Sequence, residues 1–279
     1  VGGDFSITEK VIRVTPDNGQ FKEYQENDPA SYAYTFLPAL EGNDQFTGDL
    51  SRASGENRGQ YEIEIGNLSA GVNYALVLDS GVNFEIKVAT PTIDFDNITS
   101  DVITKTYGDA DFYVTASSDF GADITYSIVG LTNGTTIDAT TGEVTLGNTG
   151  TVTIKAAVAA TTNYIAASKE ITLIINKAVL QAKADDRTIT YGDSIPEDFT
   201  ISYTGWVSPD TKADIDTEPI AFTFAKKGDN VATHSILLDG TQALDNNYTF
   251  ITEGELSLGV LTIIPQTSII DFSDIDITY

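Results

Sequence analysis

The chain repeats a short tyrosine motif at a regular spacing, and this repeat limits the possible folds more than any other sequence feature. Tyr107-Gly108-Asp109 recurs as Tyr191-Gly192-Asp193. Degraded and truncated copies stand at Tyr24-Gln25-Glu26 and at Thr278-Tyr279. The four tyrosines lie 83, 84 and 88 residues apart (24 to 107, 107 to 191 and 191 to 279). A period of this size predicts a tandem array of small domains rather than one large globule.

A second marker keeps the same spacing. Each of the first three motif tyrosines is followed, after 50 to 57 residues, by an Asn-Tyr pair and then an alternating apolar stretch: Asn73-Tyr74, Asn163-Tyr164 and Asn247-Tyr248. The first and third repeats are further alike, because residues 57–63 line up with residues 230–236. The middle repeat lacks this segment, so the order of repeats is A-B-A.

These markers predict the domain boundaries. We expect two β domains of one type at residues 1–90 and 178–265, and a β-sandwich of a second type at residues 91–177. Ile93-Asp94-Phe95 opens the middle repeat and returns as Ile270-Asp271-Phe272. Residues 266–279 are therefore expected to hold the linker and first strand of a following module, and the chain to be a piece of a longer protein.

The composition predicts an all-β fold. Thr, Asp, Gly, Asn, Ile, Val and Tyr are prominent, and these residues favour strands and turns over helices. Apolar side chains alternate from Thr151 to Ala156, as expected of a strand with one buried face. No stretch predicts an amphipathic helix of three or more turns. Repeats of this length suit tandem antiparallel β-sandwich, Ig-like domains in an elongated array.

The net charge excludes some classes of partner. The chain has 15 Lys and Arg residues against 41 Asp and Glu residues, a formal charge of -26. Such a surface repels nucleic acid phosphate and anionic membranes. No stretch approaches the roughly 20 apolar residues that span a membrane. Cysteine is absent, so the domains fold without disulfides, although this does not identify the compartment.

The Tyr-Gly-Asp motif is predicted to have a structural role. Glycine supplies a turn that other residues disfavour, and aspartate accepts hydrogen bonds from nearby N–H groups. The tyrosine ring is expected to be buried with its hydroxyl at the rim. A ligand-binding role for Tyr107 or Tyr191 is the alternative.

The first and third repeats resemble MBG domains. In the third repeat the resemblance is carried by Tyr191-Gly192-Asp193, His234-Ser235-Ile236 and Asn247-Tyr248. The middle repeat is similar to the bacterial Ig-like repeat that often alternates with them, through residues 105–109, 125–127, 150–154, 163–164 and 175–178. Such modules are typical of very large secreted or surface proteins, including adhesins of Bacteroidota. The resemblance implies an extracellular or cell-surface location and supplies no catalytic residues.

We therefore expect a structural stalk or spacer segment of an extracellular bacterial adhesin or surface filament, and not an enzyme. The one histidine, His234, is better explained as a partly exposed strand residue than as a catalytic or zinc-binding one. A carbohydrate-binding module and a non-catalytic accessory to a secreted enzyme are the alternatives. The expected partners are neighbouring modules of the same longer chain and a surface glycan or protein receptor.

Two candidate sites accompany this interpretation. Aspartates cluster at the predicted domain junctions, where carboxylates could bind calcium, although solvated aspartates at strand starts are the alternative. The candidate calcium ligands are Asp94, Asp96 and Asp101, then Asp185 and Asp186, and finally Asp271 and Asp274. Trp206, with Tyr203 nearby, is the candidate for stacking on a sugar, and a packed tryptophan is the alternative.

Overall fold

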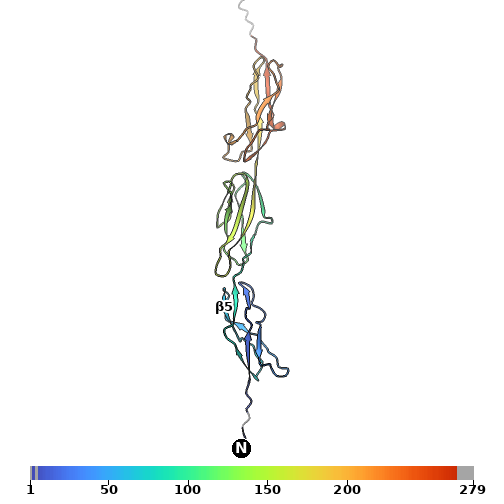
Figure 1. Cartoon of the computed structure of the whole chain (residues 1–279). Coiled ribbons are helices and arrows are strands. Elements are labelled where there is room, and N and C mark those ends of the chain that lie inside the picture. The colour runs from blue at the N-terminus through green and yellow to red at the C-terminus, as the bar shows by residue number, and fades with distance from the viewer. Residues whose placement is uncertain (1, 4–5, 269–279) are drawn as a thin grey trace, which may run out of the picture. The chain divides into compact units, whose positions relative to one another are not determined.

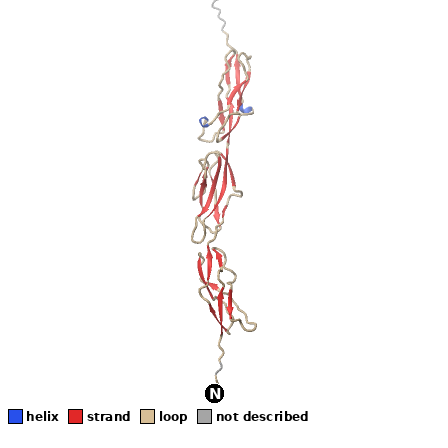
Figure 2. Ribbon diagram, in the orientation of Figure 1, coloured by secondary structure: helices blue, strands red, loops and turns tan. Residues whose placement is uncertain are grey.

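A computed structural model describes residues 2–3 and 6–268 of the chain as strands and loops with two short helical turns (Figures 1 and 2). The turns are 3-10 helices, η1 (Lys212–Asp214) and η2 (Glu255–Ser257). The prediction of an all-β fold is confirmed. The calcium candidates Asp271 and Asp274, and most of the predicted following module, lie outside the described residues.

The described strands form seven sheets, and each sheet takes its strands from one of three stretches of sequence. These are the first stretch (residues 10–87), the middle stretch (93–176) and the third stretch (178–264). By its contacts the chain divides into two compact units. Unit 1 is Val1–Asn97, Thr115–Tyr126 and Lys155–Lys169, and unit 2 is Ile98–Val114, Ser127–Ile154 and Glu170–Tyr279. Since this division passes through the middle stretch, the three-domain boundaries stay a prediction.

The first stretch forms one three-stranded and one four-stranded sheet. The first sheet has the order β3-β1-β6, with bounds Tyr34–Leu37, Lys10–Pro16 and Tyr74–Leu78. The second has the order β2-β7-β5-β4, with bounds Phe21–Glu23, Asn83–Lys87, Gly59–Glu64 and Ser51–Arg52. Figure 1 labels β5.

The third stretch repeats this topology strand for strand. Its three-stranded sheet has the order β19-β17-β22, with bounds Ile201–Thr204, Ala178–Ala184 and Tyr248–Ile251. Its four-stranded sheet has the order β18-β23-β21-β20, with bounds Arg187–Thr190, Gly259–Ile264, Thr233–Asp239 and Ile220–Thr223. The predicted likeness between the first and third repeats is confirmed at the level of strand order.

The middle stretch has a different arrangement. Two strands form the pair β11-β8, bounds Ala116–Ser118 and Ile93–Phe95. Three form the sheet β10-β14-β13, bounds Phe112–Tyr113, Glu143–Thr145 and Thr136–Ile137. Four form the sheet β12-β15-β16-β9, bounds Thr125–Val129, Gly150–Val158, Ala167–Asn176 and Val102–Thr106.

The prediction of antiparallel sheets needs a correction, because each stretch also contains parallel pairs. The parallel pairs are β1 with β6, β2 with β7, β9 with β16, β17 with β22, and β18 with β23. In each pair the strands are far apart in sequence, so the intervening chain returns to the same end of the sheet before the second strand begins. The sheets are therefore mixed.

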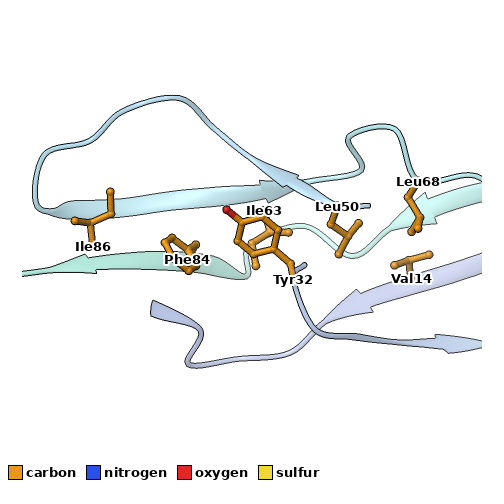
Figure 3. Close-up of a cluster of buried hydrophobic side chains, with 7 residues drawn as sticks. All are labelled: Val14, Tyr32, Leu50, Ile63, Leu68, Phe84 and Ile86. Carbon is orange, nitrogen blue, oxygen red and sulfur yellow. The ribbon is translucent and has the colours of Figure 1, made fainter. Parts of the chain in front are cut away.

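Burial alternates along β15, as the sequence predicts for residues 151–156, and along other long strands. Strand β17 alternates between buried and more exposed positions, with Leu180, Ala182 and Ala184 fully buried. In the first stretch, buried side chains from several strands and loops meet in one cluster that lies between the strands (Figure 3). The cluster consists of Val14, Tyr32, Leu50, Ile63, Leu68, Phe84 and Ile86. Of the helical turns in the described residues, none is long and apolar enough to cross a membrane.

Candidate functional site

The motif Tyr107-Gly108-Asp109 forms a tight turn directly after strand β9. The Asp109 carboxylate accepts a hydrogen bond from the Thr106 N–H at 2.8 Å, and the Asp109 N–H donates to the Thr106 carbonyl at 2.9 Å. Gly108 has φ +86°, a left-handed conformation that favours glycine. The Tyr107 N–H donates to the Asn176 carbonyl at 2.8 Å, which ties the turn to the end of β16.

The other two motif copies that lie within the described residues form the same turn. At Tyr191-Gly192-Asp193, the Asp193 carboxylate accepts from the Thr190 N–H at 2.9 Å and Gly192 has φ +93°. The degraded copy keeps the geometry, because Glu26 accepts from the Glu23 N–H at 2.7 Å and Gln25 adopts φ +70°. We call these three turns the head turns. The structural role predicted for the motif fits this shared geometry.

The Asn-Tyr pairs are held by local hydrogen bonds. The buried Asp245 carboxylate accepts from the backbone N–H groups of Asn247 and Tyr248 at 2.7 and 2.8 Å. The Asn247 carbonyl accepts from the Ala178 N–H at 2.9 Å, which places the pair beside the first residue of β17. We call the three Asn-Tyr pairs the tail pairs.

Within unit 2, the head turn of the middle stretch contacts the tail pair of the third stretch. The Tyr107 and Tyr248 hydroxyls both donate to Asp210 Oδ2, each at 2.8 Å, and the Val207 N–H donates to the Tyr248 hydroxyl at 2.9 Å. The rings of Tyr107 and Tyr248 meet edge to face with centroids 5.7 Å apart. A carboxylate that accepts two phenol hydrogen bonds joins the two stretches through strong polar contacts.

Gly108 approaches the third stretch so closely that a larger residue would not fit. A Cβ at this position would lie 2.5 Å from both methyl carbons of Val207. At Gly192, a Cβ would meet no atom of the described residues within 4 Å. The same glycine therefore serves two purposes at residue 108, backbone turn and close contact, and only the first at residue 192.

Burial changes the acidity of these tyrosines. Burial first, and then the hydrogen bond to Asp210, raise the pKa of Tyr107 to about 12. Burial also raises the pKa of Tyr248, and the hydrogen bond to Asp210 adds to this rise, while the Val207 N–H opposes it. The neutral phenols are thus the forms that the contact stabilises.

In unit 1, the head turn of the first stretch contacts the tail pair of the middle stretch through rings. The Tyr24 ring packs against Phe120 at 5.9 Å, edge to face, and against Tyr164 at 6.4 Å. Phe120 and Tyr164 pack on each other at 5.8 Å. The ring partners of Tyr24 are aromatic, whereas Tyr107 contacts both a tyrosine and the Asp210 carboxylate. Both head tyrosines contact the tail tyrosine of the next stretch.

The tail asparagine makes the same two hydrogen bonds in both units. In unit 1, Asn163 Oδ1 accepts from the Arg58 N–H at 2.9 Å, and its Nδ2 donates to Asn57 Oδ1 at 3.0 Å. In unit 2, Asn247 accepts from the Thr149 N–H and donates to Asn148 Oδ1, both at 3.1 Å. Each tail asparagine therefore hydrogen-bonds with an asparagine and with the residue after it, and these two residues directly precede a strand.

Sequence reasoning missed the residues that receive the tyrosine and asparagine. Asp210 lies 38 residues from Tyr248 and belongs to no repeated motif. Asn57 and Asn148 carried a usable signal, because each precedes by two residues the first residue of a strand, β5 or β15. That recurrence could have marked them as a third repeated feature.

Of the five described calcium candidates, four accept hydrogen bonds through their carboxylates. Asp94 accepts from Lys169 Nζ at 2.9 Å, and Asp96 accepts from Ser117 at 2.6 Å. Asp185 accepts from Ser202, and Asp186 from the Val260 N–H at 2.9 Å. The Asp101 carbonyl accepts from the Thr172 N–H.

Across residues 2–3 and 6–268, no three acidic or histidine side chains are grouped closely enough to hold a metal ion. The Ser202 hydroxyl and then Thr200 lower the pKa of Asp185 by hydrogen bonding to it. Calcium binding at the junctions stays a prediction, as does any role of Asp271 and Asp274.

The candidate glycan residues pack against their neighbours. Trp206 is half-buried, and its ring meets Tyr248 edge to face at 5.6 Å and Tyr203 at 5.7 Å. The Tyr203 hydroxyl donates to Glu218 at 3.1 Å. These contacts provide a packing role for Trp206. Glycan binding stays a prediction that a tryptophan-fluorescence titration with polysaccharides would test.

Comparison with known proteins identifies the family. Residues 12–84 and 180–257 match the family described as MBG domain (YGX type), and together they cover more than half of the chain. The chain therefore belongs to this family. The two matched segments fall within the first and third stretches, where the sequence predicted MBG-type modules. No curated protein matches the sequence.

Several solved structures of tandem domains are similar at low identity. An I-band fragment of titin, I67–I69, is 10% identical over 91% of this chain and 97% of its own, with a TM-score of 0.33. Mouse cadherin-23 EC22-24 is 12% identical over 94% of this chain and 98% of its own, with a TM-score of 0.30. These TM-scores are low, and the all-β class rests on the described strands.

Proposed function

We propose that this chain is a structural segment of an extracellular bacterial surface protein of the adhesin or filament type. In this role it spaces or presents a binding region and performs no catalysis. The observation that carries the proposal is the repeated junction chemistry. In each unit a head tyrosine contacts the tail tyrosine of the following stretch. The tail asparagine of that following stretch forms a hydrogen bond with an asparagine of the preceding stretch.

Repeated contacts of this kind support a mechanical role. Domains that are joined flexibly need no repeated contacts between them, whereas a spacer benefits when successive domains resist bending. Lys177 is the one residue between β16 and β17, so the linker is very short. Its Nζ donates to the Asp245 carbonyl at 2.6 Å, which further ties the linker to the third stretch.

The charge of the chain is consistent with this role. A formal charge of -26 disfavours nucleic acid and anionic membranes as partners. It also keeps neighbouring copies apart except where specific contacts form. Membership in the MBG family fits a repeat module, and the extracellular location follows from the kind of protein in which such modules are expected.

Small-angle scattering of the full chain tests the proposal. We expect an extended particle, and we expect the double variant Asn163→Ala and Asn247→Ala to show a broader distribution of interatomic distances because both junctions lose their amide contacts. Asn73→Ala is the matched control, since Asn73 occupies the same motif position and is exposed. A compact wild-type particle, or a double variant with an unchanged distribution, would contradict the proposed role.

A further inference from the structure

Every parallel pair among the described strands joins the beginning of a stretch to its end. In the third stretch, the first strand β17 pairs with the second-last strand β22, and the second strand β18 pairs with the last strand β23. The first stretch has the same arrangement, in β1 with β6 and β2 with β7. In the middle stretch, the second strand β9 pairs with the last strand β16.

This pairing decides how a stretch responds to tension along the chain. In a parallel pair, the N-terminal end of one strand and the C-terminal end of the other lie at opposite ends of the pair. Tension enters a stretch through its first strands and leaves through its last strands, so it pulls the paired strands past each other along their axes. Their hydrogen bonds are then loaded together. An antiparallel pair pulled from the same chain ends would instead open one bond after another.

The head turn closes each parallel pair that includes a last strand. The N–H of the head tyrosine donates to the carbonyl of the final residue of that strand: Tyr24 to Lys87 at 3.0 Å, Tyr107 to Asn176 at 2.8 Å and Tyr191 to Ile264 at 2.8 Å. The carboxylate of the turn accepts from the N–H of the residue before the tyrosine. The head turn therefore adds one more bond to the pair and fixes the end of the second strand.

The tail pair holds the start of each stretch. The carbonyl of the tail asparagine accepts from an N–H in or just before the first strand: Asn73 from Lys10 and Asn247 from Ala178, both at 2.9 Å, and Asn163 from Ala89 at 3.1 Å. Ala89 also forms an isolated parallel bridge with Tyr164. Both repeated markers of the sequence thus lie where the first and last strands of a stretch are joined.

The pairs that include a last strand are covered by the core on one face. Leu261 and Ile263 of β23 are buried, as are Leu173 and Ile175 of β16. In β2, Lys22 is buried, and its ammonium group binds the carboxylates described below. This cover excludes water from one side of the loaded hydrogen bonds, and a hydrogen bond is stronger where water does not compete for its groups.

We propose that each stretch bears tension along the chain, and that the parallel pairs between its first and last strands resist this tension. The inference rests on the proposed function, because only a segment placed between an anchor and a distal binding region is loaded along its length. It extends that function from spacing to load bearing, and it assigns the load to particular strand pairs.

Pulling one stretch in two directions tests the proposal, because the two directions load the same bonds differently. The chain has no cysteine, so attachment points can be chosen freely. Val179→Cys with Gln266→Cys loads β18 and β23 from opposite ends. Ser194→Cys with Gln266→Cys loads both strands from the end at which β23 finishes, so that they peel apart. All three positions are exposed.

With DNA handles in optical tweezers, the Val179/Gln266 chain is expected to unfold at a force at least about twofold higher than the Ser194/Gln266 chain, because the bonds over four register pairs are loaded together. Denaturant unfolding of both chains controls for their stability. Equal forces, or a lower force for the Val179/Gln266 chain, would overturn the inference.

Two proline variants of β9 test the pair in the middle stretch. Successive residues of a strand alternate in direction. The Tyr107 N–H bonds to β16 and the Thr106 N–H bonds to Asp109, so the Lys105 N–H faces β16 and the Thr104 N–H faces away. Proline has no N–H, so only Lys105→Pro removes a bond of the parallel pair.

We expect Lys105→Pro to raise the unfolding rate at constant force, with the chain pulled from its two ends, by about five- to tenfold relative to Thr104→Pro. Lys105→Ala controls for the lysine side chain, which lies over the Phe112 ring. Equal rates for the two prolines would show that the bonds to β16 carry no load. The pulling-direction test alters no residue of β18 or β23, so it decides the inference even if Lys105→Pro does not fold.

The outcomes for the inference and for the proposed function are separable. An extended particle in small-angle scattering together with equal forces in the two pulling directions removes only the inference. A compact particle removes the proposed function, whatever the forces.

Discussion

At the scale of single residues, the same motif tyrosine has a different environment at each copy. Tyr107 is packed on Tyr248 and bound to Asp210, while Tyr191 is 44% exposed. Their own turns are alike, because backbone geometry and the aspartate hydrogen bond are the same in both. The role of the tyrosine is therefore decided by the residues that contact its ring from the next stretch, and the motif itself does not decide it.

The two glycines of the motif allow this difference to be measured. Gly108→Ala and Gly192→Ala should each cost about 1 kcal/mol, because both glycines adopt left-handed backbone. Gly108→Ala should cost about 1–3 kcal/mol more, since its methyl group would overlap Val207. Thermal or denaturant unfolding of both variants checks this, and equal destabilisation would show that the close contact with Val207 is unimportant.

Tyr107 also predicts a loss of stability in alkali. Its pKa in the folded chain, about 12, lies above the ordinary value of 10.0, so the folded state favours the neutral phenol. The resulting stability is fully present below pH 10 and is lost as the pH rises through about 12. We expect the alkaline fall in unfolding free energy to be smaller in Tyr107→Phe, by about 1 kcal/mol after allowance for solvent screening.

Lysines and other tyrosines titrate in the same range, and the difference between wild type and variant removes their contribution. Tyr191→Phe is the matched control, because it alters the equivalent tyrosine of an exposed head turn. Denaturant unfolding at several pH values measures the effect. Parallel pH curves for wild type and Tyr107→Phe would argue against a stabilising phenol at Asp210.

At the scale of elements, a charged cluster joins strands of the first stretch. Lys22 of β2 and Arg52 of β4 have side chains that are 5% exposed, and both bind Asp28, at 2.7 and 2.8 Å, and Glu56, at 2.6 Å. Burial opposes ionisation of Asp28, but hydrogen bonds from Arg52 and Lys22 outweigh it and hold the pKa of this carboxyl well below its usual range. The cluster links the two edge strands of one sheet.

This cluster predicts acid sensitivity. Because the pKa of Asp28 is lowered on folding, its contribution is present above its ordinary pKa of 3.8 and is lost as the pH falls towards the folded value. Asp28→Asn should cost about 1–3 kcal/mol at neutral pH, less than a fully buried pair, and should weaken the acid dependence. Glu56→Gln, at a carboxylate 70% exposed, should cost less. Denaturant unfolding at neutral and acid pH compares them, and equal losses would contradict the assignment.

The elements also mark a limit of prediction from sequence. Alternation predicted the buried positions of β15, because a strand with one buried face repeats every two residues. The parallel pairing of β1 with β6, or of β18 with β23, has no local signal. Strand direction depends on how the chain returns across the sheet, which neither alternation nor composition records.

At the scale of the whole molecule, calcium binding remains the main untested prediction. Four of the five described candidate aspartates have carboxylates that accept hydrogen bonds within the chain, such as Asp94 from Lys169. If calcium nevertheless binds, millimolar calcium should raise the melting temperature, because a ligand that binds only the folded state stabilises it. Magnesium at the same concentration controls for ionic strength. An unchanged melting temperature would contradict the prediction of calcium binding.

By itself the sequence determined the period of the repeat, the all-β class and the family of the first and third stretches. These follow from spacing, residue type and alternation, which are properties of short segments. Only the tertiary structure decided that Tyr107 meets Tyr248 and that Asn148 receives Asn247. Asp210, which binds both tyrosine hydroxyls, carries no motif, because its position is fixed by the fold of the third stretch and not by its neighbours in sequence. The repeated tyrosine could be identified from the sequence. Its partners could be identified only from the tertiary structure, which brings together strands that are distant in sequence.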